Sequence, residues 1–225
     1  MTLYVTLILF PLILGIWAQI KVQTKYDKWS KVDSKGKISG AEAAAAVMEQ
    51  AGIHNVTIVA IDGKLTDHYD PIHRRLALSK NNYYGTSLAA LGVAAHEAGH
   101  AIQHKQAYAP LQWRSALIPA TNIACQLLPW VVFGGFFLNL VGLVKLAVWI
   151  YLILAIFQLV TLPVEFDASA RAKKILVNLS IIDTQESKGV CETLNAAALT
   201  YVAAFIASLG QLIYYIMLSR NNDND

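Results

Sequence analysis

Long segments without charged side chains constrain this chain more than any other feature. Residues 2–20 and Leu194–Leu218 carry no charge, and the 46 residues of Leu117–Leu162 carry one, Lys145. A helix needs about 20 apolar residues to cross a hydrocarbon core of about 30 Å, so the middle stretch has room for two crossings. Charged residues make up only 15% of the chain, against about 25% in soluble domains. The sequence therefore predicts a mainly α-helical integral membrane protein with about four transmembrane helices.

The first apolar segment has two interpretations. A secretory signal peptide would begin with basic residues, but none precedes this segment, and six lysines follow it between Lys21 and Lys37. Basic residues favour the cytoplasmic side of a membrane. We therefore predict an uncleaved anchor at residues 1–20 with its N-terminus outside, bent at Pro11. A tight turn is expected near Asn139–Lys145, between the two middle helices.

The basic residues indicate which segments share a side of the membrane. Of the 18 Lys and Arg residues, 12 lie within 21–116 and four within 163–193. Four spans that start outside place these two stretches together, and the positive-inside rule makes that side cytoplasmic. The predicted order is a cytoplasmic region at 21–116, a transmembrane hairpin at 117–162, a cytoplasmic helix at 163–193, a transmembrane helix at 194–218 and a polar tail at 219–225.

The region 21–116 has the pattern of a small α/β structure. Helix formers at 41–51 and 87–106 predict two helices. Apolar and β-branched residues predict strands, and the alternation at 75–79 is typical of a half-buried one. The strand at 56–61 is expected to turn at Asp62-Gly63 and return at 64–66.

The predicted helix at 87–106 contains His96-Glu97-Ala98-Gly99-His100. Residues four apart share one helix face, so the two imidazoles can occupy two positions on one Zn²⁺. Glu97 projects beside the metal, where a carboxylate can accept the proton of a bound water, and Gly99 leaves room for metal and substrate. The alternative is two surface histidines with an incidental glutamate. The apolar surroundings favour the zinc site, because ionisable groups are costly there.

A third ligand is expected where the third span leaves the membrane and a new helix begins, at LPVEFDASARAKK (162–174). Glu165 is the first choice and Asp167 the second, although both acids could simply favour a helix N-terminus. Ser169, four residues after Glu165, or Asp167 would support a ligating histidine. His104, two turns from His96, is too far along the helix to join the same metal; it is expected to support a ligand or face the substrate, or else to be an interfacial histidine. The remaining candidate ligands are His54, His68 and His73.

Four separated motifs, HEAGHAIQH (96–104), LTDHYDP (65–71), PVEFDASARA (163–172) and LNAAALTYVAA (194–204), together resemble the YugP-type neutral zinc metallopeptidases of bacteria. More distantly, HExxH followed by Glu-Phe resembles membrane gluzincins of the HtpX and CAAX-protease type. The resemblance implies zinc at His96, His100 and Glu165, Glu97 as base, and a zincin-like region carrying HExxH.

The expected function is zinc-dependent peptide hydrolysis at the cytoplasmic side of the cell membrane, with His68, Tyr69 or Arg171 stabilising the oxyanion. Arg171 could instead pair with Asp167. The expected partners are the lipid bilayer and a peptide or protein substrate, which could itself be a membrane protein. No nucleic-acid partner is expected. A non-catalytic scaffold that retains a metal site and a metal-handling membrane protein are the alternatives. Cys125 and Cys191 are expected to be small buried side chains.

Overall fold

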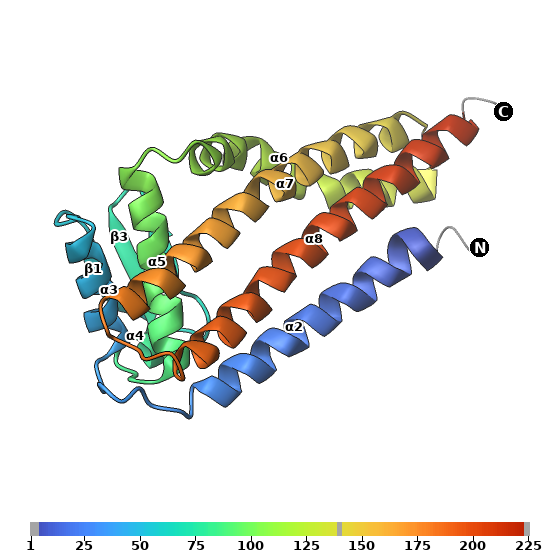
Figure 1. Cartoon of the computed structure of the whole chain (residues 1–225). Coiled ribbons are helices and arrows are strands. Elements are labelled where there is room, and N and C mark those ends of the chain that lie inside the picture. Colours follow the sequence, from blue (N-terminus) through green and yellow to red (C-terminus); the bar gives the residue numbers. More distant parts are fainter. Residues whose placement is uncertain (1–4, 139–140, 223–225) are drawn as a thin grey trace. The chain divides into compact units, whose positions relative to one another are not determined.

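The computed structural model describes residues 5–138 and 141–222, and the chain divides into two compact units (Figure 1). The membrane unit contains residues 1–19, 112–163 and 199–225. The second, the sheet unit, contains residues 20–111 and 164–198. The expected class is confirmed, since long apolar helices dominate the chain and one small sheet accompanies them.

Four segments are helical, long and apolar enough to cross a membrane: Thr6–Trp29, Ala109–Gly135, Gly142–Asn178 and Ser187–Arg220. The helices that contain them are η1 (Val5–Leu9, a π-helical turn), α2 (Phe10–Trp29), α6 (Ala109–Leu138), α7 (Val141–Asn178) and α8 (Ser187–Asn222). The backbone changes from π to α geometry beside Pro11, which has no N–H to donate to the carbonyl of Leu7.

Two predicted boundaries differ from the structure. Asn139 lies outside the described residues, but the rest of the predicted turn, Val141–Lys145, is already helical. No new helix begins after the third span, because α7 continues through Pro163 to Asn178. Proline inside a lipid-embedded helix is tolerated where neighbouring groups satisfy the freed carbonyl. Glu165 and Asp167 therefore lie within a helix, and the explanation that they favour a helix N-terminus is wrong.

The membrane unit exposes large apolar side chains that a water-soluble protein would bury. Trp130 is 77% exposed and Trp149 is 64% exposed. A smaller internal cluster contains Ala124, Val131, Ala147 and Ile150. Cys125 is exposed, contrary to the expected burial, because it lies on the outer side of α6, where an apolar thiol suits lipid. This distribution of apolar groups fits a lipid solvent.

Serine caps start both predicted helices of the sheet unit. α3 (Gly40–Gln50) begins after Ser39, whose hydroxyl accepts a hydrogen bond from the backbone N–H of Glu42 while the Glu42 side chain accepts from the N–H of Ser39. α5 (Leu88–Lys105) begins after Ser87, whose hydroxyl accepts a hydrogen bond from the backbone N–H of Ala90. A short helix, α4 (Lys80–Tyr83), lies between them in the sequence. α3 and α5 pack through small apolar side chains in one core.

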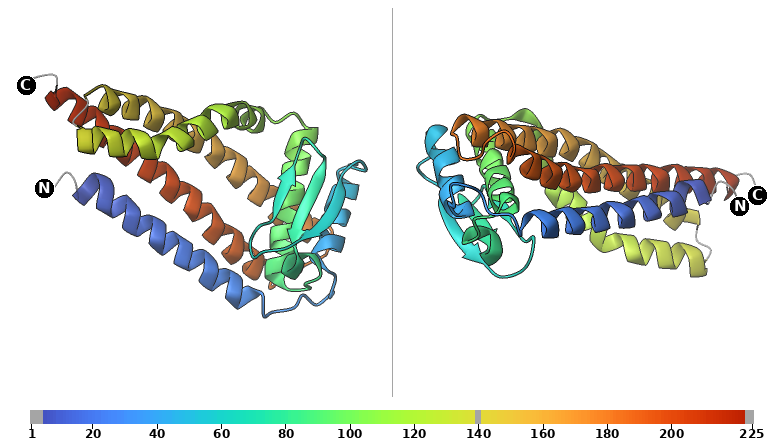
Figure 2. Two further views of the ribbon diagram at one scale, coloured as in Figure 1. Left: turned by 180° about the vertical axis from the view of Figure 1, so that it is seen from behind. Right: turned by 60° about the horizontal axis from the view of Figure 1, so that its bottom comes forward.

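The sheet contains β1 (Thr57–Ile61), β2 (His68–Asp70) and β3 (Arg75–Ser79) in the order β1-β3-β2. β3 is central, parallel to β1 and antiparallel to β2. Figure 2 shows the sheet beside α5, which contacts both β2 and β3. β2 is consequently an edge strand next to the helix that carries the histidines.

The predicted return strand at 64–66 is wrong. Gly63 and Leu65 have positive φ angles of 108° and 56°, which a strand does not allow. The hydroxyl of Thr66 also donates to the carbonyl of Asp62 and closes a loop there. The next strand after β1 is β2, which pairs with β3 and not with β1. Because β3 is central, four of its five residues are buried rather than every second one.

Candidate metal centre

His96 and His100 on α5 face Glu165 on α7, and all three belong to the sheet unit. His96 Nε2 lies 3.2 Å from one carboxylate oxygen of Glu165, and His100 Nε2 lies 3.8 Å from the other. One ligand atom from each residue lies within 4.8 Å of the others, and within 5–138 and 141–222 no other such group of three His, Cys, Asp or Glu side chains occurs. His100 and Glu165 are buried, and His96 is partly buried.

The second nitrogen of each imidazole has its own partner. His96 Nδ1 lies 3.1 Å from the hydroxyl of Ser169, and His100 Nδ1 lies 2.9 Å from the amide oxygen of Gln103. An amide oxygen only accepts hydrogen bonds, so His100 Nδ1 is the donor to Gln103, and Nε2 is the ring nitrogen directed toward Glu165. Such partners orient histidines that bind metals.

Gln103 is fully buried and links α5 to α7. Its amide nitrogen donates to the Val164 carbonyl and to an Asp167 carboxylate oxygen, each at 2.8 Å. Because both partners are acceptors, the amide cannot be reversed, and its oxygen must face His100. Asp167 also accepts from Arg171. The network therefore fixes the orientation of His100 through Gln103.

Several predicted roles differ from the positions that these residues occupy. Asp167 lies outside the cluster of three donors and supports Gln103 instead, while Ser169 holds His96 at the position expected from sequence. Arg171 pairs with Asp167, and its guanidinium also donates to the Gln106 side chain at 2.6 Å. This is the ion pair that the sequence left open as the alternative to a catalytic role for Arg171.

Gly99 serves helix packing, a role that its position in the motif did not indicate. A Cβ atom at this position would lie 2.9 Å from the carbonyl oxygen of Ala168 and 3.3 Å from its Cα. Only glycine allows so close an approach of the α5 and α7 backbones. The donor side chains of both helices meet because of this contact.

Glu97 is buried at 7% exposure on α5, directly after His96. The pKa of Glu97 is raised to about 7, mainly by burial and also by the negative charges of Glu165 and Asp67, while His96 and His68 act in the opposite direction. The exposed His68 is thus within electrostatic range of this carboxylate. A carboxyl group with such a pKa can accept and release a proton near neutral pH.

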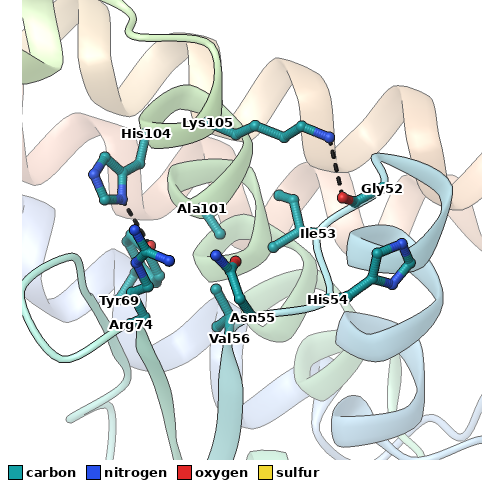
Figure 3. A pocket seen from close by; sticks show the side chains of 10 residues that line it. All are labelled: Gly52, Ile53, His54, Asn55, Val56, Tyr69, Arg74, Ala101, His104 and Lys105. Carbon is teal, nitrogen blue, oxygen red and sulfur yellow. Dashed lines mark hydrogen bonds between the residues drawn. The ribbon is translucent and has the colours of Figure 1, made fainter.

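The other histidines occupy different surroundings. His104, one turn beyond His100, lies with Nδ1 2.9 Å from the Tyr69 hydroxyl (Figure 3). His73 pairs with Asp70 at the tip of the β2–β3 hairpin. His54 is exposed beyond the end of α3. These three residues and His68 lie outside the cluster of three donors.

Two contributing residues were missed at the sequence level. Gln103 follows His100 by three residues, a spacing that places it on the same helix face, so its support could have been inferred. Asp67 accepts hydrogen bonds from the Ser79 backbone and hydroxyl and from the Asn82 amide. No sequence pattern indicated that Asp67 raises the pKa of Glu97, because this effect depends on how the loop before β2 folds.

The cluster fits zinc by its donor chemistry. Catalytic zinc sites use three nitrogen or oxygen ligands and leave a fourth position open. With bonds of about 2.0–2.2 Å, ligand atoms on a tetrahedron lie about 3.4 Å apart. The three residues place one donor atom each within 4.8 Å of the others. Two imidazole nitrogens and a buried carboxylate are suited to Zn²⁺.

Comparison with known proteins agrees with this chemistry. Residues 4–220 match the model of the family described as "Putative neutral zinc metallopeptidase". The chain is 41% identical over 223 residues to "Putative membrane protease YugP" of Bacillus subtilis (strain 168), with 99% of each chain covered. No solved structure matches the chain. The resemblance inferred from four motifs thus extends over nearly the whole sequence.

Proposed function

This chain belongs to the neutral zinc metallopeptidase family, and on that premise we propose that it is a membrane-embedded zinc endopeptidase that hydrolyses peptide bonds. The observation that carries the proposal is the buried Glu97 beside three converging donors. Metal binding alone would need His96, His100 and Glu165. Glu97 is a fourth ionisable group beside them, and its burial costs free energy of desolvation. A role in proton transfer explains why it is there.

In the proposed mechanism, His96, His100 and Glu165 hold the zinc ion. When bound, zinc polarises a water and a substrate carbonyl and lowers the pKa of that water toward ~7. A Glu97 carboxylate oxygen would accept a proton from water as the water oxygen bonds to the scissile carbonyl carbon, and would deliver that proton to the amine nitrogen as the C–N bond breaks. Ser169 and Gln103 keep both imidazoles directed at the metal position throughout.

The developing oxyanion needs a donor, and His68 is the residue we propose. Its Nδ1 donates to the Thr66 carbonyl at 2.9 Å, so Nε2 can donate to an oxyanion only in the imidazolium form, and the ring lies within electrostatic range of Glu97. Tyr69 is the second choice, because its hydroxyl pairs with His104. Arg171 is the third, because its guanidinium is held by Asp167 and Gln106.

We place the enzyme in the cell membrane as a multi-pass protein with the active site at the cytoplasmic side. The support is the concentration of 16 of 18 Lys and Arg residues in 21–116 and 163–193. The donor residues lie within the same two stretches. A peptide or protein would be the substrate, including segments of membrane proteins that emerge on that side.

Replacement of Glu97 by Gln tests the mechanism. Gln keeps the size of the side chain but cannot take the proton, so zinc content should stay unchanged while cleavage of casein is lost. Glu49→Gln, at an exposed position on α3, is the matched control and should retain full activity. Cleavage by Glu97→Gln at the wild-type rate would refute the role of Glu97. Unchanged zinc content in His96→Ala would refute the metal site.

A non-catalytic scaffold that retains a metal is the second candidate function, favoured by the structural pairing of Asp167, Gln103 and Arg171 behind the donors. The same experiment separates the two. If the zinc-loaded wild type cleaves no casein or peptide library while a protein partner co-purifies with it, the scaffold is the better account.

A further inference from the structure

A groove of about 490 Å³ runs along the C-terminal half of α5 (Figure 3). It lies entirely within the sheet unit, between α5, the segment after α3, and the β2–β3 hairpin. Its volume is in the range of sites that hold small ligands or side chains. The polar side chains lining it are those of His54, Asn55, Tyr69, Arg74, His104 and Lys105.

The lining of this groove has one sign of charge. Its residues include one arginine, one lysine and two histidines, and no aspartate or glutamate. Lys105 is already committed, because its ammonium donates to the carbonyls of Ala51 and Gly52 at 2.6 Å and 3.1 Å. Those carbonyls follow the C-terminus of α3, so Lys105 offsets the partial negative charge there. Arg74 is consequently the cation left to attract a ligand.

No carboxylate neutralises Arg74 among the residues that the structure describes. Asp70, the nearest acid along the hairpin, accepts from the backbone of Ile72 and His73 and from the His73 ring. Figure 3 shows Arg74 close to Tyr69 and His104 at one end of the groove. The positive charge of Arg74 lowers the pKa of Tyr69 against the larger effect of burial, which agrees with that proximity.

The groove starts close to the candidate metal centre. His104 follows His100 by one helical turn, about 6 Å along the axis, and Ala101 lines the groove directly after His100. An extended peptide advances about 3.3 Å per residue. A substrate with its scissile carbonyl at the metal would therefore reach the groove within about two residues.

We propose that this groove is a substrate subsite for a carboxylate group, anchored by Arg74 and assisted by the side-chain amide of Asn55. The carboxylate would belong to an Asp or Glu side chain, or to the C-terminus of the substrate, one or two residues from the scissile bond. The preferred substrate is thus a peptide with an acidic group beside the cleavage point. This subsite rests on the proposed peptidase function.

Short peptide hydroxamates test the subsite without requiring a known substrate, because the hydroxamate anchors them on zinc. The zinc-loaded wild-type protein in detergent is titrated with pairs that carry Glu or Gln one or two residues from the hydroxamate, on either side of it. A further pair has a free or an amidated C-terminus, which separates the two sources of carboxylate. At least one carboxylate peptide should bind about fivefold or more tightly than its neutral match.

Arg74→Gln should remove this preference, and Arg74→Glu should reverse it toward a matched Lys peptide. Arg75→Gln is the control, since Arg75 is equally exposed and adjacent in sequence but does not line the groove. Equal binding of all matched pairs to the wild type, or an equal loss in Arg75→Gln, would overturn the subsite while leaving the peptidase intact. If no hydroxamate binds the zinc-loaded protein, the metal centre itself fails, and the subsite with it.

Discussion

Replacement of Gln103 by Leu tests how much of the metal affinity comes from residues that never touch the metal. Gln103 is fully buried, accepts a hydrogen bond from His100 Nδ1, and donates to Val164 and Asp167. Leucine has a similar size and fills the same space. The substitution therefore removes the hydrogen bonds without opening a cavity.

Two costs follow from these contacts. Without Gln103 the His100 ring can rotate or change tautomer, and losses of this kind weaken metal binding about 10- to 100-fold, or about 1.4–2.7 kcal/mol. The Nδ1–H of His100, a residue only 8% exposed, also loses its partner, and an unsatisfied buried donor costs about 1–3 kcal/mol of stability. The metal-free protein should thus be less stable as well.

Zinc affinity is measured by competition with a chromophoric chelator, and stability by thermal unfolding of the metal-free protein. Gln106→Leu is the matched control, because it removes the acceptor of Arg171 at the exposed end of α5 without touching His100. We expect its zinc affinity to stay within about twofold of wild type, as for most surface changes. Wild-type affinity in Gln103→Leu, or an equal loss in Gln106→Leu, would refute the claim that Gln103 orients the ligand.

Two further predictions concern the same helix. Burial raises the pKa of Glu97 from 4.5 to about 7 in the absence of metal, so the wild type loses stability as pH rises between these values. The free energy of unfolding of Glu97→Gln should therefore equal that of the wild type near pH 4 and exceed it by roughly 3 kcal/mol above pH 7, at 1.36 kcal/mol per pH unit. A difference in urea unfolding that stays constant across this pH range would contradict the burial of an ionisable Glu97. Gly99→Ala should lower stability by about 1–3 kcal/mol, because its Cβ would lie 2.9 Å from the Ala168 carbonyl oxygen. Gly92→Ala should cost less, because the atom nearest to its Cβ would be a side-chain methyl of Val190 at 3.3 Å. Equal melting temperatures of the two variants would contradict the packing role of Gly99.

The elements of the sheet unit that carry strong local signals were predictable. Ser39 and Ser87 mark the starts of α3 and α5 through caps that depend on a few neighbouring residues. The predicted strand at 75–79 also forms, as β3. The pairing of the strands was harder to predict. The backbone at Gly63 and Leu65 has positive φ angles that end the extended conformation, and the sequence does not indicate them at Leu65.

The continuation of α7 was not predictable from local signals. Pro163 and the first acidic residues after a long apolar run both indicate a boundary in a sequence. In the structure the helix passes Pro163 and carries Glu165 inside it, where Val164 and Ala168 are fully buried. Packing against α5 outweighs the local cost of proline, and that packing is a long-range property.

The placement of the donors follows from a repeat that α5 and α7 share. On α5, His96, Gly99, His100 and Gln103 occupy positions i, i+3, i+4 and i+7, and on α7, Glu165, Ala168, Ser169 and Ala172 do the same. This spacing forms one stripe along a helix. The stripes meet where Gly99 contacts Ala168, which sets Glu165 against both histidines and Ser169 against His96.

Metal donors, their supports and the backbone contact of Gly99 with Ala168 therefore belong to a single interface between two helices. A change that separates the helices should weaken metal binding, because the donors come from both of them. Stability and the candidate chemistry are thus coupled through the same eight positions. The smallest residues of the stripes, Gly99 and Ala168, contribute to that chemistry as much as the charged ones, because the donor distances of 3.2 Å and 3.8 Å depend on their contact.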